Sequence, residues 1–306
     1  MEIEKCSLCP RHCSASRTAD SGEGFCRMGS DAVVARAALH FWEEPCISGK
    51  NGSGAIFFSG CSLHCVFCQN NRISRENFGR RVSADELSDL FRRLVDQGAE
   101  NINLVTATHF VPVVLQALQC YRPPVPVIFN CGGYETVETL RALEGWVDIY
   151  LPDLKYGLSE PAQRYSSAPD YPGIAQAALL EMHRQQPECR YDERGMLQKG
   201  MIVRHLILPE NTCSSIAVLE WLAQNMPQVP VSLMAQYLPC GRASDFPEIN
   251  RRITLREYNK VLDRLFALNL DGFVQERSSA KKAFIPPFNL EGLENKSGTS
   301  SADALQ

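Results

Sequence analysis

The chain has 306 residues, of which 44% are hydrophobic, enough for one large domain with a sizeable core. Its formal net charge of −4 gives no electrostatic reason to expect nucleic acid or an anionic membrane as a partner. Residues 1–6 do not resemble a signal peptide and no apolar run approaches a membrane span, so we expect a cytoplasmic protein without a membrane partner.

From residue 51 onward, short apolar segments alternate with helical patterns. The segments are rich in Val, Ile and Phe and are continuously apolar, which is typical of parallel strands covered on both faces. Strands are predicted at 55–59, 102–106, 125–130, 147–154, 201–208, 229–237 and 271–275.

Helices are predicted between these strands. Ser83 and Thr254 each stand three residues before a glutamate, which is the pattern of a capping box. Further helical patterns cover 113–119, 137–143 and 216–225, while the long insertion 169–200 either covers the opening of the fold or forms a surface helix. Strands that alternate with helices indicate right-handed βαβ units.

The predicted fold class is therefore α/β, a partial (β/α)6-type TIM-like barrel with a cysteine-rich N-terminal extension. We divide the chain into a cysteine-rich segment over 1–50 with its own candidate metal site, a barrel over 51–280 and a polar tail over 281–306. No internal repeat is visible.

Three cysteines follow the first predicted strand with the spacing C-x3-C-x2-C: Cys61, Cys65 and Cys68. In a reducing compartment, clustered thiols indicate metal ligands rather than disulfides. A closed structural site takes four ligands, so three cysteines leave one coordination position open for a group that reacts. Zinc, or coincidence among thirteen cysteines, is the alternative.

A second group of four cysteines has the spacing C-x2-C-x3-C-x12-C near the N-terminus: Cys6, Cys9, Cys13 and Cys26. Two short spacings in a turn-rich segment favour a closed site, either a structural zinc or a second iron–sulfur cluster. Four thiols without a ligand are the third interpretation. His12 and His64 lie inside the two cysteine groups and are predicted to face solvent, whereas His205 is predicted to be hydrogen-bonded in the core.

Polar side chains recur where the predicted parallel strands end. The carboxyl ends of such strands meet at one edge of a barrel, where loops can vary without disturbing the core. A polar ligand crossing the mouth of the barrel would need this distribution. The side chains are Thr106 and Thr108, Asn130, Asp153 and Lys155, and Arg204.

The segment from Gly60 to Cys68, with Phe67 before the last cysteine, resembles the radical S-adenosylmethionine (SAM) superfamily. The resemblance implies that Cys61, Cys65 and Cys68 hold a 4Fe-4S cluster whose fourth iron binds SAM, and that Phe67 meets the adenine. It also implies reductive cleavage of SAM to a 5′-deoxyadenosyl radical that abstracts hydrogen from the substrate. The electron would come from a flavodoxin- or ferredoxin-type reductant.

Within that superfamily, the chain resembles the branch related to the pyruvate formate-lyase activating enzyme. The resemblance rests on Asp153-Leu154-Lys155 and on the segments 43–45, 68–70, 203–209 and 234–237. It implies a glycyl-radical enzyme or another protein substrate as the partner. It also implies that Arg204 pairs with the SAM carboxylate and that Lys155 adds a charge; the alternative for both is an internal salt bridge.

Two departures from the family pattern concern the SAM site. The superfamily has Gly-Gly-Glu at the position where this chain has Thr106-Ala107-Thr108-His109. Either the hydroxyls of Thr106 and Thr108 accept a hydrogen bond from the SAM amino group, or the two threonines are ordinary strand residues. Asn130 and Cys131 stand where the activase has an acid beside a monovalent cation. A cation bound by Asn130 and Asp153 would then have one negatively charged ligand fewer than in the activase. Cys131 is interpreted as a small residue packed in the core.

Three functions fit these features. The first is activation of a glycyl-radical enzyme. The second is a radical SAM maturase or small-molecule enzyme without a glycyl-radical partner. The third belongs to another class: a metal-stapled binding or assembly protein that has lost the radical chemistry.

Overall fold

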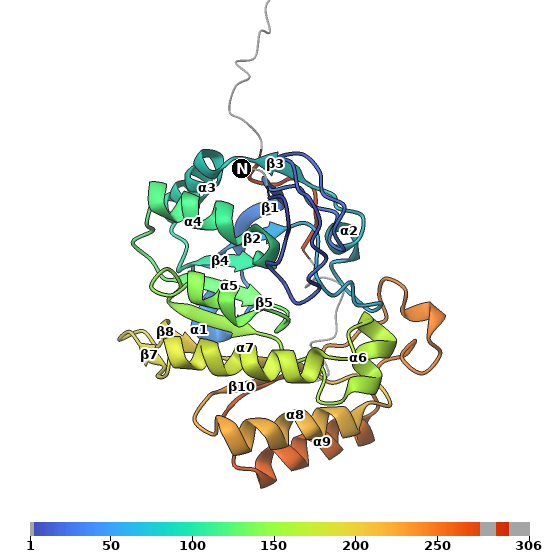
Figure 1. Ribbon diagram of the computed structural model, residues 1–306. Helices are drawn as coiled ribbons and strands as arrows, with labels where there is room; N and C mark the ends of the chain where they lie inside the picture. Colours follow the sequence, from blue (N-terminus) through green and yellow to red (C-terminus); the bar gives the residue numbers. More distant parts are fainter. Residues whose placement is uncertain (1–2, 276–285, 294–306) are drawn as a thin grey trace, which may run out of the picture.

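The computed structural model describes residues 3–275 and 286–293 and forms two sheets (Figure 1). The larger sheet has the strand order β3-β1-β2-β4-β5-β6-β8-β7, and the smaller has the order β11-β10-β9. The strands are β1 (Ala32–His40), β2 (Ser53–Phe58), β3 (Arg80–Val82), β4 (Ile102–Val105), β5 (Val127–Cys131), β6 (Ile149–Pro152), β7 (Arg190–Tyr191), β8 (Leu197–Met201), β9 (Val203–Leu206), β10 (Val231–Met234) and β11 (Gly272–Val274).

The two sheets are connected because β6 and the residues that follow it form hydrogen bonds with the segment that runs from β8 into β9. β8 and β9 are separated only by Ile202, whose N–H donates to the Tyr150 carbonyl over 3.1 Å. Beyond it, the Leu154 N–H donates to the Arg204 carbonyl over 2.8 Å. The strands β2, β4, β5, β6, β8 with β9, β10 and β11 therefore form one parallel row, which confirms the predicted α/β partial barrel.

Each of the seven predicted strands is present, but four further strands were missed: β1, β3 and β7, which pair antiparallel, and β8, which pairs in parallel with β6. β1 pairs with β2 from Val34 opposite Phe58 to His40 opposite Ser53, so residues assigned to the N-terminal segment extend the barrel sheet. β3 is short and pairs with β1, and β7 is short and pairs with β8. β3 and β7 are the edge strands of the larger sheet and β1 and β8 lie next to them, where the continuous apolar signal of a central parallel strand is weak.

Helices fill the connections between the strands. The helices are α1 (Pro45–Ser48), α2 (Asn71–Ser74), α3 (Ala84–Asp96), α4 (Val111–Cys120), α5 (Val137–Ala142), α6 (Ser159–Ser166), α7 (Tyr171–Gln185), α8 (Thr212–Asn225) and α9 (Leu255–Ala267). Ser83 and Thr254 form complete capping boxes at the starts of α3 and α9, as predicted. The insertion 169–200 contains α7, whose buried face, including Ala175, Ala178 and Leu179, makes it a packed helix.

Residues 286–293 run beside β1. The Leu290 N–H donates to the Ala35 carbonyl, the Ala37 N–H donates to the Glu291 carbonyl, and Arg36 forms an ion pair with Glu291 over 3.0 Å. This part of the predicted tail therefore pairs with the barrel, while the rest of 281–306 lies outside the described residues. In the described part of the chain, no helix has both the length and the apolar character needed to cross a membrane.

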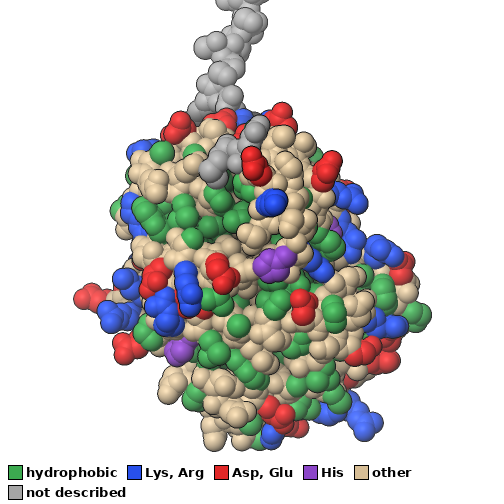
Figure 2. All heavy atoms as spheres, in the orientation of Figure 1, with side chains coloured by type: hydrophobic (Ala, Val, Ile, Leu, Met, Phe, Trp, Pro, Cys, Tyr) green, Lys and Arg blue, Asp and Glu red, His purple; other side chains and the backbone are tan. Residues whose placement is uncertain are grey.

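Acidic and basic side chains are interspersed over the face shown in Figure 2. Thirteen cysteines lie in the described residues, and no disulfide joins any of them.

Candidate functional site

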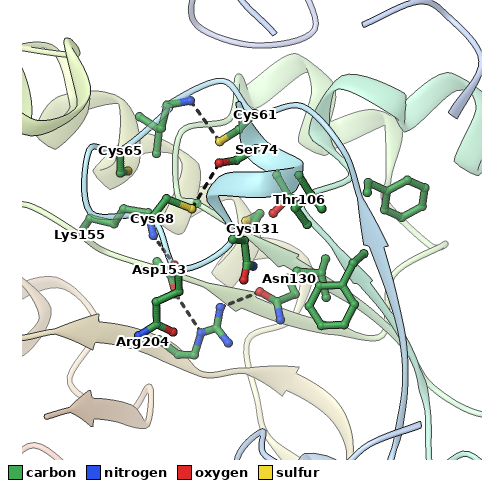
Figure 3. A pocket seen from close by; sticks show the side chains of 18 of the residues that line it. Cys61, Cys65, Cys68, Ser74, Thr106, Asn130, Cys131, Asp153, Lys155 and Arg204 are labelled. Carbon is green, nitrogen blue, oxygen red and sulfur yellow. Dashed lines mark hydrogen bonds and ion pairs between the residues drawn. The ribbon is translucent and has the colours of Figure 1, made fainter. Parts of the chain in front are cut away.

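A cavity of about 270 Å³ opens at the carboxyl ends of the parallel strands. All the predicted cofactor-binding residues line it, together with the three cysteines of the first group (Figure 3). β2 leads into the cysteine loop, β4 into Thr106, β5 ends beside Asn130, and β6 leads into Asp153. Residues from successive strand ends thus meet in one place, as the parallel arrangement requires.

Each sulfur of the cysteine loop faces a hydrogen-bond donor. The Leu63 N–H lies 3.3 Å from Cys61 Sγ, and the hydroxyl of Ser74 lies 3.4 Å from Cys68 Sγ. The third sulfur, Cys65 Sγ, accepts from the hydroxyl of Ser166 over 3.0 Å. Donors aimed at sulfur stabilise the thiolate form, which is the form that binds metal, so the loop fits an iron–sulfur cluster.

Burial raises the pKa of the Cys61 and Cys68 thiols. It raises the pKa of Cys61 to about 12, and the neighbouring Cys65 and Cys68 add to the shift. A bound cation reverses this effect because it favours the thiolates. Within the described residues, no three His, Cys, Asp or Glu side chains surround a single ion position; a four-iron cluster spreads its ligands over several irons and does not require one.

Arg204 and Asp153 form the centre of a charged network at the cavity wall. Arg204 Nε lies 2.9 Å from Asp153 Oδ1, and its Nη1 lies 3.0 Å from Glu43 Oε2. The other terminal nitrogen donates to Asn130 Oδ1 over 2.6 Å. The guanidinium is therefore held in an internal salt bridge, the arrangement weighed as the alternative to a pair with the SAM carboxylate.

Lys155 shares the same partner. Its ammonium contacts Asp153 Oδ2, the only hydrogen bond of this ammonium within the described residues. Burial lowers the pKa of Lys155, but the charges of Asp153 and Cys65 outweigh burial and raise it. Burial also raises the pKa of Asp153, and Arg204 and Lys155 reverse that effect and hold it below its usual range. Lys155 keeps two of its three N–H donors for an incoming carboxylate, whereas every nitrogen of Arg204 already makes one hydrogen bond.

Phe67 lines the cavity and belongs to an aromatic cluster. Its ring centroid lies 6.4, 6.3 and 5.9 Å from those of Tyr156, Tyr165 and Tyr237, in edge contacts. The ring is 7% exposed. These contacts fix its position, and its approach to an adenine stays a prediction.

Thr106 and Thr108 have different environments. Thr106 has φ of +63°, an uncommon conformation for a β-branched residue, and its N–H donates to the Asn130 carbonyl over 2.8 Å. The Thr108 hydroxyl donates to Glu135 Oε1 over 2.9 Å. Glu135, which follows β5, is not among the site residues predicted from the sequence.

Glu135 is buried, and the pKa of its carboxyl is raised. Burial raises the pKa of its carboxyl to about 7, although hydrogen bonds from neighbouring side chains oppose the shift. Gly133 allows its loop to pass close to the Asp153 carbonyl, which a side chain at that position would strike.

This raised pKa predicts a stability change with pH. The folded state holds the Glu135 proton at pH values where the unfolded chain has lost it, so the stabilisation is present below about pH 4.5 and is lost as pH rises through 7. Relative to Glu135→Gln, the free energy of unfolding of the parent should fall by about 2–3 kcal/mol between pH 5 and pH 8. Urea titrations at both pH values measure this difference, and exposed Glu138→Gln should show no such trend.

The histidine predictions have mixed outcomes. His205 is buried, with Nδ1 2.6 Å from the Leu154 carbonyl oxygen and Nε2 2.8 Å from Ser215 Oγ, as predicted. His12 is exposed. The prediction for His64 was wrong, because its ring stacks on Phe25 at 4.6 Å and is partly buried.

The four N-terminal cysteines lie near one another. Cys6, Cys9 and Cys26 are buried, and Cys13 is exposed. Burial and then the charges of the other three raise the pKa of Cys9 to about 12, although a backbone hydrogen bond opposes the shift.

Arg11, between the second and third of these cysteines, joins their segment to the first cysteine loop. It donates to the carbonyls of Ser62, Ser166 and Ser167 over 2.6–2.8 Å. The Phe25–His64 stack is a second contact between the same two segments. The N-terminal segment therefore packs directly on the loop that carries Cys61 and Cys65.

The chain is similar to several known proteins. The sequence model of the radical SAM superfamily matches residues 55–166, which begin in β2 and include the cysteine loop. An uncharacterised protein of Methanocaldococcus jannaschii, MJ0674, is 30% identical over 279 residues, covering 88% of this chain and 76% of that protein. The crystal structure of methylornithine synthase (PylB) aligns with a TM-score of 0.48 and 17% identity, covering 78% of this chain and 72% of that one.

Proposed function

Because the chain belongs to the radical SAM superfamily, we propose that it cleaves SAM reductively and abstracts hydrogen from a glycine of a partner glycyl-radical enzyme. The observation that carries the proposal is the loop after β2, where Cys61, Cys65 and Cys68 line the cavity and each sulfur faces a donor. Three thiolates suit a 4Fe-4S cluster with one open iron.

When bound, the cluster and SAM supply a 5′-deoxyadenosyl radical on receipt of one electron, which a flavodoxin- or ferredoxin-type reductant would provide. The protein itself binds SAM, orients it and shields it from water. Lys155 offers an ammonium to the carboxylate of SAM, and Asp153 holds that ammonium in place. The aromatic cluster around Phe67 excludes water from one wall.

A protein substrate is favoured by the rim of the cavity. Phe41 and Trp42 follow β1 and are 49% and 59% exposed, and Trp42 lines the opening. Adjacent exposed aromatic side chains are typical of surfaces that bind another protein. A maturase or small-molecule enzyme without a glycyl-radical partner is the second candidate, since the cavity also suits a small polar ligand.

For the N-terminal cysteines we propose a closed metal site, either zinc or a second iron–sulfur cluster. Its support is that Cys6, Cys13 and Cys26 lie close enough to Cys9 to raise its pKa and that the segment packs on the first cysteine loop. No three of these thiols surround a single ion position within the described residues, so a single zinc ion would require them to move closer together. A metal there would stabilise a segment that has little regular structure of its own. We also propose a cytoplasmic enzyme, because a reducing compartment keeps such thiols available.

Electron paramagnetic resonance tests the glycyl-radical assignment. The reduced enzyme with SAM is mixed anaerobically with glycyl-radical enzymes encoded in the same genome, and one of them should acquire the doublet of a glycyl radical. The matched control is the Cys61→Ala enzyme, which should produce none. SAM cleavage with no radical in any of these partners would favour the maturase or small-molecule enzyme instead.

A further inference from the structure

Arg17 is a buried arginine within the segment that carries the N-terminal cysteines. It is 1% exposed, the smallest exposed fraction of any arginine in the described part of the chain. Its Nε lies 3.0 Å from the Met28 carbonyl oxygen, Nη2 donates to the Gly29 carbonyl, and Nη1 lies 3.6 Å from Cys6 Sγ. Met28 closely follows Cys26, so this side chain connects the first of the four cysteines to the chain beside the last.

The positive charge of Arg17 has no carboxylate partner within the described residues. Its side-chain hydrogen bonds go to two uncharged carbonyls and one sulfur. Arg36 and Arg204, which are also shielded from solvent, form ion pairs with Glu291 and Asp153. A buried charge is costly unless a group of opposite charge lies beside it. The group beside Arg17 that can become negative is a cysteine sulfur.

Metal binding would turn the neighbouring sulfurs into the missing counter-charge. A metal binds cysteine as the thiolate, and four thiolates outweigh the positive charge of a Zn²⁺ ion or of a 4Fe-4S core. Either centre is therefore an anion. The Phe110 ring, whose centroid lies 5.8 Å from the guanidinium carbon of Arg17, adds a cation–π contact but no net negative charge.

We propose that Arg17 is the counter-ion of an anionic metal centre at the four N-terminal cysteines and donates an N–H to Cys6 Sγ, an inference that rests on the metal site proposed above. Arg17 is a positioning residue, because it acts on the metal through the sulfur. Gly22 allows the enclosure, since a side chain at that position would strike both the Met28 carbonyl and the side chain of Arg17.

Competition with a chelator tests the inference without turnover. The starting protein is the full chain with Cys61, Cys65 and Cys68 replaced by alanine, which removes the first cysteine site. It is loaded anaerobically with Zn²⁺ in one sample and with Fe²⁺ and sulfide in another, and the metal kept per chain is measured against rising EDTA.

The uncharged variant Arg17→Met should lose half of its metal at an EDTA concentration about 10- to 100-fold lower, the range for loss of a partner of a metal ligand. Arg17→Lys keeps the charge and should recover most of the affinity. The matched control is Arg27→Met, which removes an exposed arginine next to Cys26 and should keep the metal as firmly as the starting protein.

Two results would overturn the inference. One is an Arg17→Met protein that keeps its metal as firmly as the starting protein. The other is an equal loss of affinity in Arg17→Met and Arg17→Lys, which would mark a role in holding the Met28 and Gly29 carbonyls alone. If Arg17→Met does not fold, Arg17→Gln replaces it under the same criteria.

Failure of the proposed metal site is a distinct result. The starting protein would then keep neither zinc nor iron, which would overturn the role of Arg17 as well, because no centre would be present for it to stabilise. The proposed cleavage of SAM is not touched by this outcome, since the first cysteine site is absent from every protein in the experiment.

Discussion

Replacement of Cys61, Cys65 and Cys68 by alanine is expected to remove the iron of the first cysteine site and to abolish SAM cleavage. The three sulfurs are the ligands of the proposed cluster, and all three cysteines line the cavity. Iron, zinc and acid-labile sulfide per chain, measured after anaerobic reconstitution, report the loss.

The matched control is Cys131→Ala. Cys131 is a buried thiol that lines the same cavity and is interpreted as packing, so this variant should keep its iron. The triple variant also assigns the second site, because residual iron would indicate a second cluster at the N-terminal cysteines and residual zinc a structural ion. Iron unchanged in the triple variant would contradict the assignment of the first site.

Asp153→Asn is expected to destabilise the fold by about 3 kcal/mol, because it leaves two partly buried cations without their shared partner. Asp153 contacts both Arg204 and Lys155, and the three side chains are 14–21% exposed. Urea unfolding of parent and variant, with the metal content matched, measures the change.

An exposed ion pair supplies the control for this variant. Glu220 pairs with Arg264 where both side chains are about half exposed, so Glu220→Gln should change the free energy of unfolding by less than about 1 kcal/mol. Equal effects of the two substitutions would show that the Asp153 network contributes no more than a surface pair.

Seven of the parallel strands could be predicted because burial on both faces leaves a continuous apolar signal in the sequence, a signal that β8 lacks because Gln198 and Lys199 interrupt it. β1 could not be separated from the cysteine segment by that signal. Its central Arg36 breaks the apolar run, and its partner Glu291 lies 255 residues away. Pairing between segments so distant along the chain depends on the completed fold, which no local pattern encodes.

The convergence of Asp153, Lys155 and Arg204 could be predicted for a similar reason, since the ends of parallel strands share one edge. Two acids were missed, Glu43 and Glu135, because both stand in loops whose paths depend on tertiary contacts. The signal for Glu43 was its place in Glu43-Glu44-Pro45, noted only for its family resemblance. For Glu135, the signal was an acid directly after the glycine pair that follows β5.

Reductive cleavage of SAM at the cysteine loop is the activity that we propose for this chain. The most direct measurement is 5′-deoxyadenosine, quantified by mass spectrometry after the anaerobically reconstituted protein is incubated with dithionite and SAM. The parent should form it, and Cys61→Ala should stay at the level of a protein-free mixture. A parent at that background level, or a Cys61→Ala protein as active as the parent, would contradict the claim.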